Sequence, residues 1–191
     1  AGHMAGVALG DWISEHWDGV FDRLIVLEER RPGALVAARI QGQLDGLQSK
    51  VGPVSPDQTL HLDSGNTSEI SQANMTEALA GLPDMRRIAV ISFNDDAAVG
   101  AVAAAREAGR EQDVVIVGQG ADRVARREIR RPGSRLIGSA AYWPERYGRK
   151  LIKVAQEILR GEPVPPAVYS KHVFITKENI DEFYPNSGSG S

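Results

Sequence analysis

The sequence contains no cysteine, and this absence excludes two kinds of site. Among its 191 residues there is no thiolate that could form a disulfide or bind a metal ion. The fold must therefore be stabilised by a buried core, and a chain of this length with 42% hydrophobic residues can build one. The redox compartment stays open, because a chain without cysteine suits either kind.

The chain also lacks long apolar runs and a large excess of either charge. No apolar segment approaches the roughly 20 residues that a membrane-spanning helix needs. The formal net charge is -3, so the basic surface typical of nucleic-acid-binding proteins is missing at the level of the whole chain. We therefore expect a globular protein that neither inserts into membranes nor binds nucleic acid.

Both ends of the chain resemble engineered sequence. Residues 1–4 read Ala-Gly-His-Met, which resembles a cloning scar, and residues 186–191 resemble a flexible linker. We set both aside in predicting the fold. On this interpretation a natural signal peptide would lie outside the sequence.

Short apolar runs alternate with amphipathic segments along the middle of the chain. The predicted strands are 24–27, 59–62, 88–91, 114–117 and 135–140, and the predicted helices are 34–51, 67–82, 96–108, 121–130 and 144–159. The strands are continuous apolar runs, which is typical of strands covered on both faces. This succession predicts an α/β fold, with a parallel sheet between two layers of helices in a flavodoxin-like three-layer αβα arrangement. Outside these units we expect a helix over 6–17, a strand over 167–176 and a helix over 177–183.

The turn after the third predicted strand carries the clearest sign of ligand binding. Ligands of open α/β sheets lie beyond the carboxyl ends of the strands, where helix N-termini offer free N–H groups. Asn94 offers both donors and an acceptor, and Asp95 accepts only. Beside Phe93, this turn suits a sugar or polyol. The alternative is that Asn94 or Asp95 only caps the following helix.

A Gly-x-Gly pattern follows the fourth predicted strand. Gly118, Gln119 and Gly120 match the start of a dinucleotide-binding turn, but the third glycine of that motif would fall at Arg123. The pattern therefore argues against a nucleotide. Two interpretations stay open, a tight turn capped by Asp122 or a ligand contact by Gln119 or Asp122.

Two aromatic residues follow the fifth predicted strand. Aromatic rings at this edge either stack on a sugar face or fill the core. We expect Trp143 to pack in the core or an interface and Tyr142 to be more open.

The residues give little support for catalysis. His16, His61 and His172 are scattered without metal-ligand spacing. The sequence has no Gly-x-Ser-x-Gly elbow, no phosphate-binding P-loop and no pair of carboxylates spaced for acid–base work. We expect a protein that binds a ligand without catalysing a reaction and without a metal or cofactor.

Several segments together resemble one protein family. They are residues 37–47, 94–101, 115–118, 142–148, 161–166 and 175–180. These segments resemble the C-terminal part of type I periplasmic binding proteins, the sugar-binding subunits of ABC importers. The resemblance covers nearly all of residues 5–185, and its most specific part is the Asn-Asp turn with its Ala/Gly-rich helix.

The resemblance implies a set of ligand contacts. Asn94 matches the family's sugar-binding asparagine. The family usually has an arginine shortly before a Gly-aromatic pair. In this sequence Gly46-Leu47 occupies the position of that pair. Gln43 then occupies the arginine position and Arg39 lies one helical turn earlier, so either could serve.

Three more positions follow from the same comparison with the family. Family members have an aspartate after a Val-Gly pair. Around Gly120 this sequence lacks that aspartate, and Asp122 lies two residues further along the chain. Tyr142 falls at a polar contact of the family, and Asn66 falls where an aromatic ring often stacks on the sugar.

The resemblance also implies what is missing. Family members have two lobes joined by three crossings, with the ligand enclosed between them. Residues 5–185 would then be the C-terminal lobe, with 135–160 derived from an absent N-terminal lobe. We expect 135–160 to fold back onto the remaining lobe, giving five βα units, or to pair with a second copy in a swapped homodimer.

The longer parent protein would be periplasmic or extracytoplasmic and would deliver its ligand to an ABC permease. The lobe alone would bind a sugar or polyol weakly or not at all, because half of the contacts are absent.

Two other functions fit the same fold. The effector-binding core of a LacI-type regulator would carry a helix-turn-helix upstream in place of a signal peptide, although the closing segments favour transport. A flavodoxin-like enzyme or signalling domain fits less well. A phospho-receiver needs a lysine after the fifth strand, where 140–142 supplies none, and a flavin site needs a phosphate loop where 28–32 stands.

Overall fold

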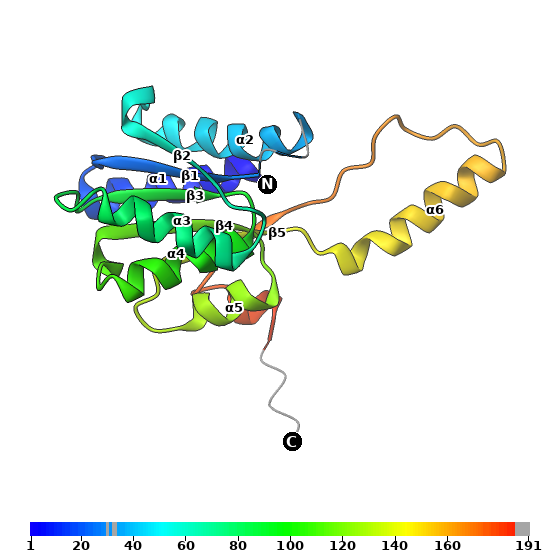
Figure 1. Ribbon diagram of the computed structural model, residues 1–191. Coiled ribbons are helices and arrows are strands. Elements are labelled where there is room, and N and C mark those ends of the chain that lie inside the picture. Colours follow the sequence, from blue (N-terminus) through cyan, green and yellow to red (C-terminus); the bar gives the residue numbers. More distant parts are fainter. Residues whose placement is uncertain (30, 32–33, 186–191) are drawn as a thin grey trace, which may run out of the picture.

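The computed structural model describes residues 1–29, 31 and 34–185, which form a single six-stranded sheet with helices on both faces (Figure 1). The strand order is β2-β1-β3-β4-β5-β6, with β1 to β5 parallel and β6 antiparallel to β5. The strands are β1 (Arg23–Glu28), β2 (Thr59–Asp63), β3 (Ile88–Ser92), β4 (Val114–Gly120), β5 (Leu136–Ala141) and β6 (Val173–Thr176). The predicted three-layer α/β architecture is confirmed, and the last strand makes the sheet mixed.

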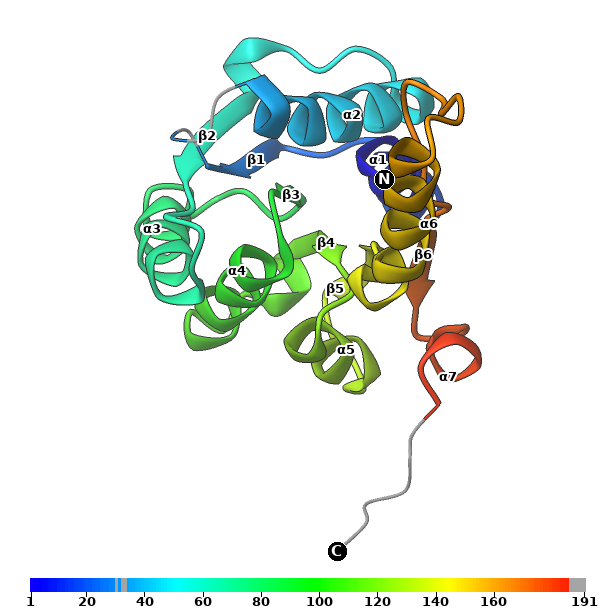
Figure 2. The ribbon, with the colours of Figure 1, turned by 90° about the vertical axis from the view of Figure 1, so that its right-hand side faces the viewer.

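Figure 2 shows how the helices cover the two faces of the sheet. The first pair, α1 (Gly2–Trp17) and α2 (Ala34–Val51), lies on one face. The other face is covered by α3 (Ser68–Ala80), α4 (Asp95–Glu107) and α5 (Arg123–Arg130). Two further helices are α6 (Tyr147–Leu159) and α7 (Ile180–Phe183), and three 3-10 turns are Pro56–Gln58, Glu111–Asp113 and Pro144–Arg146. No helix in the described part of the chain is both long and apolar enough to cross a bilayer.

The first helix begins at Gly2, four residues earlier than predicted, and packs closely on α2. A Cβ added at Gly6 would lie 1.9 Å from the carbonyl oxygen of Gln43, and one added at Gly46 would lie 2.2 Å from that of His3. Because glycines on both helices permit this approach, the two backbones come nearly into contact. Residues 2–4, set aside as a scar, are therefore part of the folded helix, whatever their origin.

Two strand boundaries differ from the predictions by more than one residue. The fourth strand runs through Gly120, so the Gly-x-Gly pattern lies in the strand and the turn begins at Ala121, whose φ is 54°. The last strand covers only 173–176 and not 167–176. It pairs with 138–141 of β5, and the residues before it have no partner strand.

The segment 135–160 is divided between two environments. Strand β5 lies between β4 and β6, so it belongs to this sheet, as the fold-back expectation requires. Helix α6 instead extends away from the body (Figure 1), and none of its residues is buried. The faces of β5 are already in contact with α1 and α5. The expectation that α6 also folds back is therefore wrong, and α6 does not join α1 to α5 in covering the sheet.

Helix α6 leaves an apolar surface uncovered. We call four of its residues the α6 stripe, and they are 65%, 61%, 58% and 86% exposed, in the order Leu151, Ile152, Ile158 and Leu159. At 3.6 residues per turn, their spacing of one and seven residues keeps them within about a third of the helix circumference, the width of an amphipathic stripe.

Candidate ligand-binding cleft

An open cleft of about 570 Å³ lies at the carboxyl ends of the central strands. It is lined by residues from α1, α2, the ends of β3, β4 and β5, and the segments around α6, namely Ala1, Gly2, Ala38, Arg39, Asn94, Gln119, Gly120, Asp122, Tyr142, Pro144, Tyr147 and His172. A second hollow of about 610 Å³ lies between α1 and the opposite end of β5. The first cleft is the candidate ligand site, because polar strand ends and helix N-termini converge there.

Arg39 of α2 supplies the positive charge of this cleft. The central carbon of its guanidinium group lies 4.9 Å from the ring centroid of Phe93 and 5.1 Å from that of Tyr142. Cation–π contact with two rings fixes the position of the group. Within the described ranges no carboxylate pairs with Arg39, so its N–H donors are available to a ligand.

Gln43, the other candidate for the arginine role, does not reach the cleft. Its side chain is fully buried, and its Nε2 donates to the Ser92 carbonyl oxygen at 2.9 Å. Of the two alternatives that the sequence left open, only Arg39 lines this cleft.

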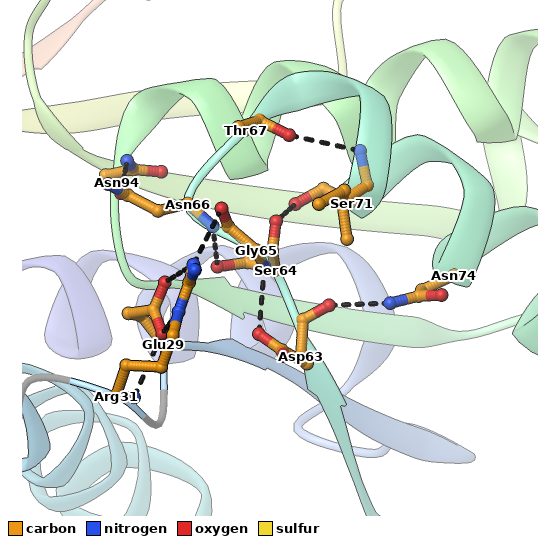
Figure 3. Close-up of polar contacts among 11 residues, drawn as sticks. Glu29, Arg31, Asp63, Ser64, Gly65, Asn66, Thr67, Ser71, Asn74 and Asn94 are labelled. Atoms are coloured by element: carbon orange, nitrogen blue, oxygen red, sulfur yellow. Dashed lines mark hydrogen bonds and ion pairs between the residues drawn. The ribbon is translucent and has the colours of Figure 1, made fainter.

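Asn94 is both a helix cap and a cleft residue. Its Oδ1 accepts the Ala97 backbone N–H at 2.9 Å, which caps α4. Its Nδ2 donates to Oδ1 of Asn66 at 2.6 Å (Figure 3). An amide nitrogen carries two hydrogens, so Asn94 retains one N–H for a ligand.

Asn66 holds Asn94 and does not line the cleft. It is exposed, has a φ of 58° and lies in the turn between β2 and α3. Arg31 supports this turn, because it forms a forked ion pair with Glu29 and donates to the Gly65 carbonyl oxygen at 3.1 Å (Figure 3). Asn66 thus orients Asn94 by a hydrogen bond. It does not lie in the cleft at the position where the family resemblance implies an aromatic ring stacked on the sugar.

Gln119 and Tyr142 form one hydrogen-bonded pair in the wall of the cleft. The Tyr142 hydroxyl donates to Oε1 of Gln119 at 2.6 Å. Burial raises the pKa of Tyr142 to about 12, so its hydroxyl is protonated at any ordinary pH. The ring also meets His172 edge to face, with 5.4 Å between the centroids. Tyr142 is half-buried, whereas Trp143 is buried against Phe183, where core packing was expected.

Asp122 occupies the N-cap position of α5 but makes no capping hydrogen bond with its side chain. Partial burial and the neighbouring charge of Asp96 raise its pKa, and Arg126 lowers it. The carboxylate lines the cleft as an acceptor. Of the two interpretations left open by the sequence, the N-cap position of Asp122 is found, although its side chain makes no capping hydrogen bond.

Asp95, which the sequence offered as an acceptor for a ligand or as a helix cap, neither lines the cleft nor caps α4. Its side chain is fully buried, with Oδ1 accepting from the Ser139 hydroxyl and Oδ2 from the Asp122 backbone N–H, each at 2.6 Å. Burial raises its pKa to about 6. A Cβ at Gly118 would lie 2.3 Å from Oδ1 of Asp95. The Gly-x-Gly pattern was the available signal, since its first glycine makes room for this carboxyl group.

Over the residues that the structure describes, no three His, Cys, Asp or Glu side chains gather as a metal site. The three candidate histidines lie apart. His16 stacks on Trp12, His61 lies 3.4 Å from a carboxylate oxygen of Glu28, and His172 lines the cleft.

The family of this chain follows from its sequence as a whole. The family model described as periplasmic binding protein domain matches residues 3–163. The chain belongs to this family. Among curated proteins, no sequence matches the chain.

Solved structures show the same fold for this periplasmic binding protein domain. One is a periplasmic solute-binding protein of an ABC transporter from Actinobacillus succinogenes 130z with bound D-allose, with 17% identity, a TM-score of 0.77 and coverage of 95% of this chain and 62% of that chain. A solute-binding protein from Agrobacterium vitis bound to α-D-tagatopyranose has 16% identity, a TM-score of 0.76 and coverage of 93% and 57%. An ABC sugar transporter subunit from Rhodobacter sphaeroides 2.4.1 has 22% identity, a TM-score of 0.76 and coverage of 93% and 63%. This binding-protein domain thus spans less than two thirds of the length of each.

Proposed function

We propose that this chain is the C-terminal lobe of a solute-binding protein that binds a sugar or polyol, without catalysis, for an ABC importer. The observation that carries the proposal is the position of Arg39, which is held between Phe93 and Tyr142 without an ion-pair partner in the described part of the chain. Asn94 and Asp122 add a donor and an acceptor on the same cleft. Alternating donors and acceptors beside aromatic rings suit a polyhydroxylated ring or chain.

The ligands of similar structures support the same class. Solved relatives of the fold hold D-allose, α-D-tagatopyranose and allitol, which are all neutral polyhydroxy compounds. Their low sequence identity gives no guide to which one this cleft would prefer, so the proposal is limited to the class.

The uncovered helix supports the proposal that the chain is one lobe of a longer protein. The α6 stripe is apolar and exposed, and a contiguous apolar surface of this kind marks an interface. We propose that α6 packs against a second lobe in the parent, and that in its absence the α6 stripe pairs with a second copy of this chain. Static light scattering tests the second part, which requires a dimer at high protein concentration.

The proposed parent acts outside the cytoplasm and delivers its ligand to an ABC permease. The sequence upstream of residue 1 in the gene tests this placement. A signal peptide there supports transport, whereas a helix-turn-helix domain would instead assign the chain to a LacI-type regulator.

Binding itself is tested by NMR titration of the chain with D-allose, D-tagatose and allitol. We expect weak binding, because one lobe supplies only part of the contacts, and much tighter binding by the longer parent. Arg39→Ala should abolish binding in both, while Gln41→Ala on the exposed side of α2 serves as control. Tight binding by the chain alone would show that a second lobe is not needed, and the absence of binding by the parent would refute the sugar-binding function.

A further inference from the structure

We propose that Gln119 is a positioning residue that fixes the Tyr142 hydroxyl as a hydrogen-bond acceptor toward the ligand. The cleft then selects a ligand with a hydroxyl donor at that point. This inference rests on the proposed function, since it concerns the specificity of the same cleft. The sequence left open a direct ligand contact by Gln119, but its side chain is 1% exposed and acts here through its neighbour Tyr142.

The orientation of the Gln119 amide is set by the Ser92 carbonyl oxygen. Gln119 Nε2 lies 3.4 Å from that oxygen, and Gln43 Nε2 donates to the same oxygen at 2.9 Å. Ser92 and the two glutamine side chains are all buried. If the Gln119 amide were reversed, its Oε1 would face the carbonyl oxygen, and two buried acceptors would repel one another. The amide nitrogen must therefore face Ser92.

The direction of the next hydrogen bond follows from this orientation. With Nε2 toward Ser92, Oε1 faces Tyr142, which must donate across the 2.6 Å contact. A phenol has one hydrogen, so the hydroxyl has no second hydrogen to offer a ligand. The lone pairs of the Tyr142 oxygen remain, and they accept only from a donor.

Two groups of the cleft, Arg39 and Asn94, have the opposite polarity, whereas Asp122 accepts as the Tyr142 oxygen does. Arg39, whose guanidinium carbon lies 5.1 Å from the Tyr142 ring centroid, only donates. Asn94 presents the second N–H of its amide, since its Oδ1 caps α4 and its other N–H binds Asn66. A sugar hydroxyl satisfies both kinds of partner, because it donates and accepts. A carboxylate or a carbonyl oxygen placed at Tyr142 would meet only lone pairs, so the cleft should favour neutral ligands with a free hydroxyl there.

The test compares ligands that differ in donor capacity at single positions. The tightest binder among D-allose, D-tagatose and allitol is titrated by NMR beside its monodeoxyfluoro analogues, in which fluorine accepts weakly and cannot donate. In the wild-type chain, fluorination at the position facing Tyr142 should weaken binding about tenfold, the loss expected for one hydrogen bond. In Gln119→Leu the hydroxyl is free to donate, so this ratio should shrink toward one. Gln41→Leu, at an exposed glutamine of α2 outside the cleft, should leave the ratio unchanged.

A merely structural role for Gln119 predicts a different result. Binding of every probe would then fall by the same factor in Gln119→Leu, the ratio would persist, and the inference would be overturned while the proposed function stood.

If no probe binds, the Gln119–Tyr142 hydrogen bond can still be tested by NMR of the chain without ligand. The side-chain amide resonances of Gln119 are assigned by their loss in Gln119→Leu. In Tyr142→Phe they should shift, and they should keep slow exchange at the hydrogen donated to Ser92. Resonances that are unchanged in Tyr142→Phe would refute the positioning pair, whatever the outcome of the titrations.

Discussion

Strand β5 and helix α6 are neighbours in sequence but have opposite surroundings. The strand lies between β4 and β6, and four of its six residues, Gly138 to Ala141, are buried in an unbroken run. The helix begins six residues later and buries none of its side chains. Both segments are apolar enough to belong to a core. The strand is buried because β4 and β6 pair with it. The helix stays exposed because α1 and α5 already cover the two faces of β5.

The largest contrast should come from the same substitution in the two regions. Gly6→Ala places a Cβ 1.9 Å from a backbone oxygen in the α1–α2 contact, whereas Gly148→Ala in α6 meets nothing within 4 Å. We expect Gly6→Ala to cost about 3 kcal/mol of unfolding free energy or more, because backbone must move. Gly148→Ala should be neutral or add up to ~1 kcal/mol through helix propensity. Chemical denaturation measures both, and equal effects would show that α6 is packed as tightly as the body.

A pH-dependent effect should be specific to the body. The pKa of Asp95 is raised from 3.8 to about 6, so the folded state retains a proton that the unfolded state releases. The unfolding free energy should therefore fall as pH rises from 4 to 6, by up to about 3 kcal/mol. Asp95→Asn should remove most of this slope, leaving the smaller part that comes from the raised pKa of Asp122, and should be more stable than the wild type above pH 6.

The matched control for the pH effect is Asp84→Asn, which changes an exposed aspartate in the turn before β3. It should leave the slope in place. A wild-type stability that rises between pH 4 and 6 would contradict the assigned role of Asp95.

The smallest effect on stability should be in α6. Substituting Leu151 and Ile158 of the α6 stripe with glutamate should change the unfolding free energy of the monomer by no more than ~0.5 kcal/mol for each residue, since both are largely exposed. Sedimentation velocity should show the loss of a dimer. A large loss of stability without a change in association would mean that the helix folds back onto the body in solution.

The same comparison shows what could be predicted from the sequence. Apolar runs and helical spacing gave the order of elements in the body, since each strand and helix there follows a local period. The position of α6 could not be read in this way. Its amphipathic pattern predicts a helix with a buried side, but the pattern does not identify the surface that covers it.

The candidate cleft was predictable to a similar extent. Asn94, Gln119, Asp122 and Tyr142 lie at strand ends, and the topology of parallel sheets brings such ends together. Their roles depend on partners distant in sequence. Gln119 is oriented by Ser92, and the choice between Arg39 and Gln43 depends on which side of α2 faces the core.

The buried role of Asp95 also could not be predicted from the local sequence pattern. Its carboxyl group is accommodated by Gly118 of the neighbouring strand and bonded by Ser139 of the strand beyond it. Three separate segments must be assembled before this role becomes visible.

The most direct test of the sugar-binding cleft is a ¹H–¹⁵N NMR titration of the chain with D-allose, D-tagatose and allitol at high concentration. We predict weak binding, with shifts confined to the cleft around Arg39, Asn94, Gln119 and Tyr142, and no shifts in Arg39→Ala. Shifts centred instead on the hollow between α1 and β5, around Trp12 and Phe174, would contradict the account.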